Sequence, residues 1–132
     1  MYLVDTSVWI DYLRERETVG AAKFAEALDR GIPFGLTGIV YQEVLQGAAT
    51  GDDFERLAEY LGTQRFYEPL DVVESYREAA RLYFRCRGSG VTVRSTVDCL
   101  IARTAIEHDL VLLHGNRDYE NMAHVIPELK TA

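Results

Sequence analysis

Four acidic side chains stand out for the chemistry they could perform together, although 38, 55 and 20 residues separate them along the chain: Asp5, Glu43, Asp98 and Asp118. Carboxylates that are brought together repel one another, and each raises the pKa of its neighbours. A cation removes this penalty, and carboxylate and water oxygens suit Mg²⁺ or Mn²⁺, which also accept phosphate oxygens. Such a site activates water and stabilises the leaving oxygen of a phosphodiester. This chemistry requires a fold that brings the four acids together.

Short apolar runs alternate with amphipathic segments, a pattern that predicts a parallel α/β sheet with helices on both faces. The expected strands are residues 2–4, 32–36, 66–70 and 110–114, with 125–126 as a last edge strand. The expected helices are residues 8–14, 19–29, 39–48, 96–108 and 119–124. Two more are expected, one capped by Asp52 or Asp53 and one that starts at Asp71. In the helix after Asp71 an apolar side is predicted from residues at helical spacing, among them Val72, Tyr76, Ala79, Ala80, Tyr83 and Phe84.

The ends of these elements are expected to place the four acids at one edge, because ligands of open parallel sheets bind beyond the carboxyl ends of the strands. Asp5 directly follows the first strand, and Asp118 follows the fourth. The helix before the fourth strand joins it by a very short connection and must run antiparallel to it, so Asp98 starts at the same edge. Glu43 lies about 7 Å into a helix that leaves the second strand by a short turn.

Each acid also has a purely structural explanation. Asp5 or Ser7 can cap the first helix, and Asp118 can cap the last one. Asp98 can form a capping box with Ser95, in which each side chain accepts a hydrogen bond from the other residue's backbone N–H. Glu43 is no cap, yet its expected position coincides with those of the others. The joint placement therefore favours a shared site over four unrelated roles.

The charge balance is divided along the chain. A net charge of −7 argues, taken alone, against binding a phosphate backbone, because Lys and Arg supply that affinity. Residues 81–103 reverse this balance locally, with five arginines against a single acid. This segment is either a solvated helix face or a basic rim around an acidic pocket.

The length and composition predict one domain over residues 1–132, with a core large enough to be stable without disulfides or a structural metal. No apolar run approaches the roughly 20 residues of a membrane helix. Residues 1–10 contain Asp5 and no basic leader, so no signal peptide is expected. Cys86 and Cys99 form no disulfide framework and match no zinc spacing, so a reduced, cytoplasmic location is expected.

Four segments resemble motifs of PIN-domain ribonucleases, and more narrowly of the VapC toxins of bacterial toxin–antitoxin pairs. They are LVDTSVW at 3–9, YQEVLQG at 41–47, TVRSTVDCLIA at 92–102 and HGNRDY at 114–119, in the family's order across essentially the whole chain. Each motif alone is weak, but four in order at these intervals are specific. The resemblance implies a PIN-like three-layer sandwich, with a central, mostly parallel sheet flanked by helices.

The resemblance also implies a Mg²⁺- or Mn²⁺-dependent endoribonuclease that cuts RNA and inhibits translation. It implies a homodimer and a cognate VapB-like antitoxin that occupies the active site. The catalytic and metal-binding residues are then Asp5, Glu43, Asp98 and Asp118, with Thr6 and Ser7 as supporting hydroxyls. The local positive charge of residues 81–103, rather than the resemblance, predicts Arg85, Arg87 and Arg94 as RNA contacts.

One position departs from the resemblance, because many relatives carry an acid where Asn116 stands. An amide oxygen can support a cation but brings no charge, so a second metal site is expected to be weak. Asn116 also keeps open a catalytically silent PIN-fold binding module. A phosphatase with Asp5 as nucleophile is disfavoured, because Ser7 stands where it needs a second acid and no lysine is placed nearby. A DNA nuclease of the wider superfamily needs additional helices for which the chain has no room.

Overall fold

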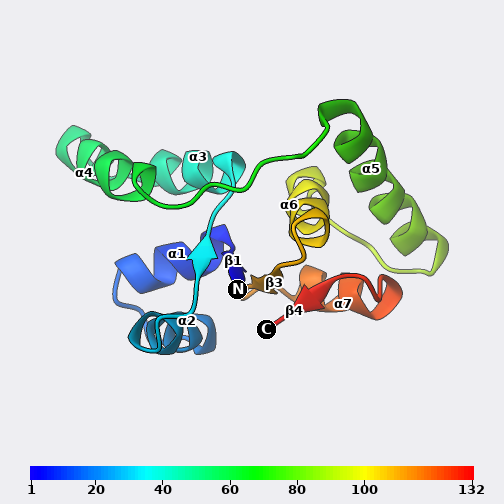
Figure 1. Cartoon of the computed structure of the whole chain (residues 1–132), viewed down its shortest axis with the longest axis horizontal. Coiled ribbons are helices and arrows are strands. Elements are labelled where there is room, and N and C mark those ends of the chain that lie inside the picture. Colours follow the sequence, from blue (N-terminus) through cyan, green and yellow to red (C-terminus); the bar gives the residue numbers. More distant parts are fainter.

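Four short parallel strands form the centre of the fold, and the structure, a computed structural model, describes residues 1–132 (Figure 1). The strands are β1 (Tyr2–Val4), β2 (Phe34–Gly35), β3 (Val111–Leu113) and β4 (Lys130–Thr131). Their order in the sheet is β2-β1-β3-β4, and every neighbouring pair is parallel. The predicted α/β fold with a parallel sheet is therefore confirmed.

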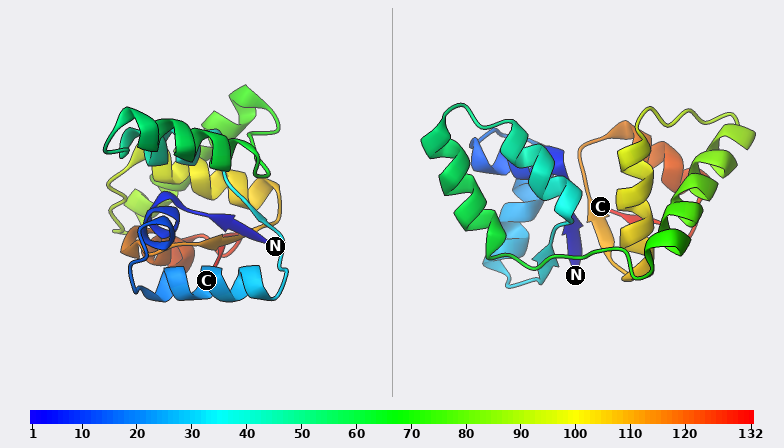
Figure 2. Two further views of the ribbon diagram at one scale, coloured as in Figure 1. Left: turned by 90° about the vertical axis from the view of Figure 1, so that its left-hand side faces the viewer. Right: turned by 90° about the horizontal axis from the view of Figure 1, so that it is seen from above.

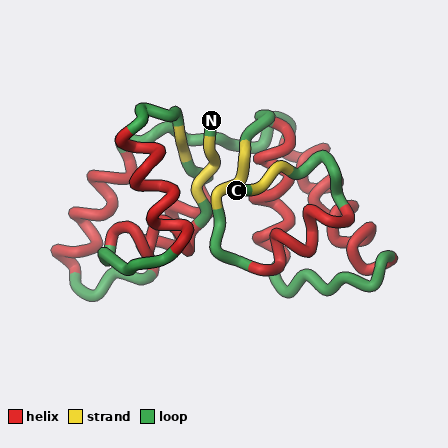
Figure 3. The backbone as a smooth tube through the Cα atoms, turned by 90° about the horizontal axis from the view of Figure 1, so that it is seen from below, coloured by secondary structure: helices red, strands yellow, loops and turns green.

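Seven helices flank this sheet. They are α1 (Thr6–Leu13), α2 (Val19–Asp29), α3 (Gly38–Gln46), α4 (Gly51–Gly62), α5 (Val72–Gly88), α6 (Thr96–Glu107) and α7 (Arg117–Val125). Helices α1 to α4 gather on one side of the strands and α5 to α7 on the other, as the view from above in Figure 2 and the tube in Figure 3 show. None of the helices is both long enough and apolar enough to cross a membrane.

The core is built on the two central strands. Leu3 and Val4 of β1 and Leu112 and Leu113 of β3 are completely buried. Each such side chain stabilises the fold by about 1.5–3 kcal/mol through removal from water. On the α1–α2 side, Trp9 also contributes to the core, with its ring 4.8 Å from that of Phe24 in an edge-to-face contact. This packing fixes the end of β1, which Asp5 directly follows, and the end of β3, five residues before Asp118.

Two of the predicted strands are wrong. In residues 66–70 only Phe66 pairs, in a single parallel bridge with Leu36. Pro69 has no N–H to offer a ladder, and the Glu68 carboxylate accepts the Gly38 N–H at the start of α3 instead, at 2.7 Å. Residues 125–126 end α7, and the edge strand is the polar β4 segment, which pairs with β3.

The helix starts are confirmed in part. Asp71 caps α5 as predicted, accepting the Glu74 N–H at 2.8 Å. The cap of α4 is Thr50 rather than Asp52 or Asp53, because the Thr50 hydroxyl accepts the Asp53 N–H at 3.0 Å. Both aspartates lie in the first helical turn, where their charge favours the helix dipole.

The apolar side predicted for α5 is mostly at the surface. Its exposed members are Val72, Tyr76, Tyr83 and Phe84, whereas the helix buries Ser75, Ala79, Leu82 and Cys86. Both sets recur at helical spacing, so periodicity alone does not distinguish the core side from a side that awaits a partner. The buried set is smaller in volume because α5 packs closely against α6.

Candidate active site

The acidic site consists of Asp5, Glu43, Asp98 and Asp118, and the structure brings them to the carboxyl edge of the sheet. Asp5 ends β1, and its N–H donates to the carbonyl of Leu113 at the end of β3, at 3.0 Å. Asp98 and Asp118 lie in the first turns of α6 and α7. Glu43 extends from α3, which begins three residues after β2.

Asp5 and Asp98 meet at one hydroxyl group. The oxygen of Tyr119 lies 3.1 Å from Oδ1 of Asp5 and 3.2 Å from Oδ1 of Asp98. The second oxygens have donors of their own: Ser7 Oγ donates to Asp5 Oδ2 at 3.1 Å, and Asn116 Nδ2 donates to Asp98 Oδ2 at 3.2 Å. The two carboxylates are therefore fixed in rotation as well as in position.

The pKa values show that the charges of the acidic site act on one another. Burial raises the pKa of Asp5. Burial and the neighbouring charge of Asp5 raise the pKa of Asp98 to about 6, and the charges of Glu43 and Asp118 add to this. All three other acids thus destabilise ionised Asp98, which is the situation that a bound cation relieves.

Glu43 is held by a hydroxyl of α1. Thr6 Oγ1 donates to Glu43 Oε1 at 2.8 Å, across 37 residues of sequence. This bond leaves Oε2 of Glu43 without a protein donor. The predicted supporting hydroxyls of Thr6 and Ser7 thus each contact an acid of the site.

Asp118 has a cation of its own. Arg94 donates to it through Nε at 3.1 Å, through Nη2 at 3.3 Å and through its backbone N–H at 3.2 Å. Burial alone would raise the pKa of Asp118, but the hydrogen bonds and charge of Arg94 lower it. Sequence reasoning predicted both residues for the site without predicting that they pair.

The structural explanations considered for the aspartates do not account for their carboxylates. Asp5 occupies the N-cap position of α1 but makes no capping hydrogen bond with its side chain, and Ser95 makes none at the start of α6. The cap of α7 is Asn116, whose Oδ1 accepts the Asp118 N–H at 2.9 Å. Asn116 thus uses its oxygen for the helix and its amide for Asp98.

The other two predicted RNA-binding arginines lie apart from the acids. Arg85 pairs with Glu128 at 2.8 Å. Arg87 lies over the rings of Tyr83 and Phe84, 5.8 and 5.7 Å from their centroids. Of the three arginines, only Arg94 contacts the acidic site.

The donors of the acidic site fit a hard cation. Carboxylate and hydroxyl oxygens are the ligands that Mg²⁺ and Mn²⁺ select, and the site contains no thiolate or imidazole ligand that would favour a softer metal. No group of three or more His, Cys, Asp or Glu side chains forms a ready-made metal cluster. The fit therefore rests on the pair Asp5 and Asp98, as expected for Mg²⁺, which is held by one or two carboxylates and keeps several waters.

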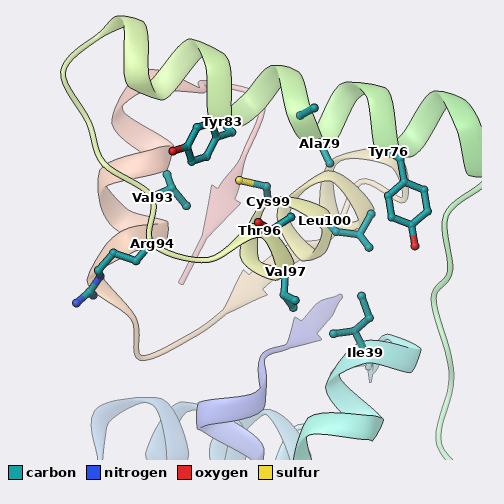
Figure 4. A pocket seen from close by; sticks show the side chains of 11 residues that line it. Ile39, Tyr76, Ala79, Tyr83, Val93, Arg94, Thr96, Val97, Cys99 and Leu100 are labelled. Carbon is teal, nitrogen blue, oxygen red and sulfur yellow. The ribbon is translucent and has the colours of Figure 1, made fainter.

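An apolar pocket of about 520 Å³ lies beside the acidic site, between α5 and α6 (Figure 4). Tyr76 and Tyr83 line it from α5, Val97 and Leu100 line it from α6, and Arg94 lies at its rim. Nine of its 11 lining residues are hydrophobic. Exposed apolar surface of this kind is a candidate interaction site.

A model of the PIN-domain family matches residues 2–125. The chain belongs to the PIN-domain family. Ribonuclease VapC11 of Mycobacterium tuberculosis is 32% identical over 129 residues, which cover 95% of this chain and 93% of that protein. Ribonuclease VapC4 of the same species is 32% identical over 128 residues, which cover 93% and 92%. Within the PIN domains, the chain therefore belongs with the VapC proteins, as its four motifs predicted.

Solved structures of low sequence identity share this fold. The chain aligns with a structure of VapBC2 from Rickettsia felis bound to a promoter DNA fragment, with a TM-score of 0.72 and 16% sequence identity. The alignment covers 99% of this chain and 96% of the chain in that structure. It also aligns with a chain of a toxin–antitoxin complex from Klebsiella pneumoniae, with a TM-score of 0.68 and 22% sequence identity. This alignment covers 98% of this chain and 95% of that one. The sheet that carries the acidic site is thus the PIN-domain sheet.

Proposed function

We propose that this PIN domain is a metal-dependent endoribonuclease toxin. It cuts RNA phosphodiester bonds, thereby inhibits translation and growth, and is neutralised by a cognate VapB-like antitoxin. The observation that carries the proposal is the meeting of Asp5 and Asp98 at one hydroxyl, with the pKa of Asp98 raised to about 6. The VapC relatives at 32% identity are named as ribonucleases, which supports RNA as the substrate.

In this proposal Asp5 and Asp98 hold one Mg²⁺ or Mn²⁺, with Glu43 and Asp118 acting directly or through water. When bound, such a cation supplies Lewis-acid chemistry, because it stabilises charge on phosphodiester oxygens and makes water a better nucleophile. Ser7 and Asn116 orient the two aspartates through the hydrogen bonds given above. Glu43 keeps Oε2 free to accept a proton from water.

Arg94 has the substrate role that the geometry supports best among the arginines. Its side chain is 75% exposed while that of Asp118 is 8% exposed, so the guanidinium reaches solvent at the mouth of the site. A planar guanidinium binds phosphate through two parallel hydrogen bonds. We infer that Arg94 receives an RNA phosphate next to the acidic site, and that Arg85 and Arg87 extend this contact along α5.

Exposed apolar surface supports both proposed protein contacts, the one with the antitoxin and the homodimer that the resemblance implies. Apolar side chains on this side of the molecule are left exposed to solvent. Some of them line the pocket of Figure 4, and the exposed set includes Val72, Tyr76, Tyr83 and Phe84 of α5. A partner seated in the pocket lies against Arg94 and therefore beside the acidic site. The solved structures with this fold include toxin–antitoxin complexes, which supports a partner of that kind.

An apolar-to-acidic change tests the partner surface. Tyr83→Glu places a charge at the pocket and should weaken the complex with the antitoxin by about tenfold or more, as loss of a buried aromatic anchor does. Val19→Glu is the matched control, because Val19 is exposed at the start of α2, outside this pocket. Equal affinity of the Tyr83→Glu and wild-type proteins for the antitoxin would place the interface elsewhere.

The second candidate function is a catalytically silent binding module. Two observations favour it. Both the oxygen and the nitrogen of the Asn116 side-chain amide are hydrogen-bonded within the protein, and Arg94 already neutralises Asp118. Calorimetric titration with Mn²⁺ separates the two functions, because a silent module needs no cation at Asp5 and Asp98. Cleavage of RNA by the purified chain, lost with a chelator and restored by Mg²⁺ or Mn²⁺, supports the nuclease, whereas binding of RNA without cleavage supports the module.

A further inference from the structure

The hydroxyl of Tyr119 has no evident packing role. Tyr119 is completely buried on α7, and its ring lies 5.1 Å from that of His114. Phenylalanine would fill the same space without the cost of burying a polar group. The only hydrogen-bond partners of this hydroxyl are the carboxylates of Asp5 and Asp98.

We propose that Tyr119 is a positioning residue that presets the pair Asp5 and Asp98 for a divalent cation. From the buried side its hydroxyl directs both Oδ1 atoms toward one point, although the two negative charges repel each other. The inference rests on the metal site proposed above and assigns the part of α7 in it. No metal ligand is added: Tyr119 acts through the two aspartates.

The two aspartates differ in exposure. Asp5 is almost completely buried, whereas Asp98 is only partly buried, so solvent reaches the pair through Asp98. Each carboxylate oxygen has two lone pairs and can accept a hydrogen bond while it binds a cation. Ser7 and Asn116 donate to the two Oδ2 atoms, and the Tyr119 hydroxyl lies within hydrogen-bond distance of both Oδ1 atoms.

The phenol carries one proton for two acceptors, so it donates to one Oδ1 at a time. Without a cation, one of the two carboxylates therefore lacks a full hydrogen bond at this point. A bound cation would offset both charges, and the hydroxyl would keep its hydrogen bond to one of the two Oδ1 atoms. Removal of the hydroxyl frees the carboxylates to turn apart, and a cation must then reassemble them.

The test is calorimetric titration of the full chain with Mn²⁺. Tyr119→Phe keeps the ring and removes only the hydroxyl, and we expect the dissociation constant for Mn²⁺ to rise by about 10–100-fold, as for other groups that orient metal ligands. Tyr67→Phe is the matched control, because Tyr67 is also a buried tyrosine but its hydroxyl bonds Met1 Sδ, away from the acids. The control should change the constant by less than about twofold.

The outcomes separate this inference from the proposed function. Wild-type and Tyr119→Phe proteins that bind Mn²⁺ equally, while Asp98→Asn does not bind, overturn the role of Tyr119 and leave the metal site standing. A wild-type protein that does not bind Mn²⁺ overturns both. If Tyr119→Phe fails to fold, a crystal structure of the wild type with Mn²⁺ decides: the hydroxyl should remain within hydrogen-bond distance of both Oδ1 atoms, and a hydroxyl displaced by the cation contradicts the inference.

Discussion

Arg94 and Asp118 form a two-point ion pair at the mouth of the acidic site, with Nε 3.1 Å from Oδ2 and Nη2 3.3 Å from Oδ1. The pair joins a nearly buried carboxylate to a largely exposed guanidinium. Arg94 therefore offsets the burial of the Asp118 carboxylate while its own guanidinium faces solvent. Removal of one partner would leave the other charge without its counter-ion, so the pair holds Asp118 in place and presents a cation at the site.

Loss of the Arg94 charge should weaken RNA binding without unfolding the protein. In an Asp5→Asn background, which prevents cleavage, Arg94→Gln should reduce the slope of log affinity against log salt by about one unit. Arg85→Gln and Arg87→Gln test the same prediction along α5. Arg30→Gln is the control, because Arg30 ends α2 at the opposite edge of the sheet and pairs only with Glu26. An unchanged slope for Arg94→Gln would restrict Arg94 to holding Asp118.

The raised pKa of Asp98 predicts how stability depends on pH in the absence of metal. The folded protein takes up this proton near pH 6, whereas the unfolded chain does so near 3.8. As the pH rises through this window the unfolded chain ionises first, so the free energy of unfolding falls. Solvent at the half-buried carboxyl reduces the effect to about 1–2 kcal/mol.

Denaturant unfolding across this pH window, with chelator present, measures the effect as the difference between the wild type and Asp98→Asn. The variant should lack this decrease in stability, because it has no carboxyl to ionise. Saturating Mn²⁺ should remove the decrease in the wild type, since the cation binds the ionised form. Parallel pH profiles for the two metal-free proteins would show that Asp98 is not the responsible group.

Replacement of Asn116 tests the second metal site. Asn116→Asp keeps an oxygen to cap α7 but replaces the Nδ2 donor to Asp98 by a further negative charge. The variant should be less stable without metal, because repulsion in the site increases. It should also reach half-maximal cleavage at a lower Mg²⁺ or Mn²⁺ concentration. Identical cleavage curves would leave Asn116 as a helix cap and orienting donor only.

The convergence of the acids followed from the sequence because it depends on chain direction alone. Asp5 and Asp118 follow parallel strands, and parallel strands end at one edge. Asp98 and Glu43 lie on helices that connect to those strands by short turns. Neither step requires knowledge of side-chain packing, and the α/β fold with its parallel sheet was predictable for the same reason.

The partners of the acids could not be predicted in this way. In the sequence Tyr119 has the features of a core aromatic at the start of a helix, and its hydrogen bond to Asp5, 114 residues away, is seen only in the structure. Its place directly after Asp118 was the one available signal. The exposed side of α5 could not be predicted either, because Tyr76 and Tyr83 recur at the spacing of core residues and only the structure shows that they are exposed.

The pair of aspartates is the central claim, and one comparison tests it most directly: the initial rate of RNA cleavage by Asp5→Asn and by Asp11→Asn at saturating Mg²⁺. Both variants remove one carboxylate near the start of the chain, but Asp11 pairs with Arg16 on the surface of α1. With folding checked by circular dichroism, Asp5→Asn should lose cleavage by about 100-fold or more, equivalent to about 2.7 kcal/mol of barrier, while Asp11→Asn stays near the wild type. A folded Asp5→Asn protein that cuts RNA at the wild-type rate would contradict the account.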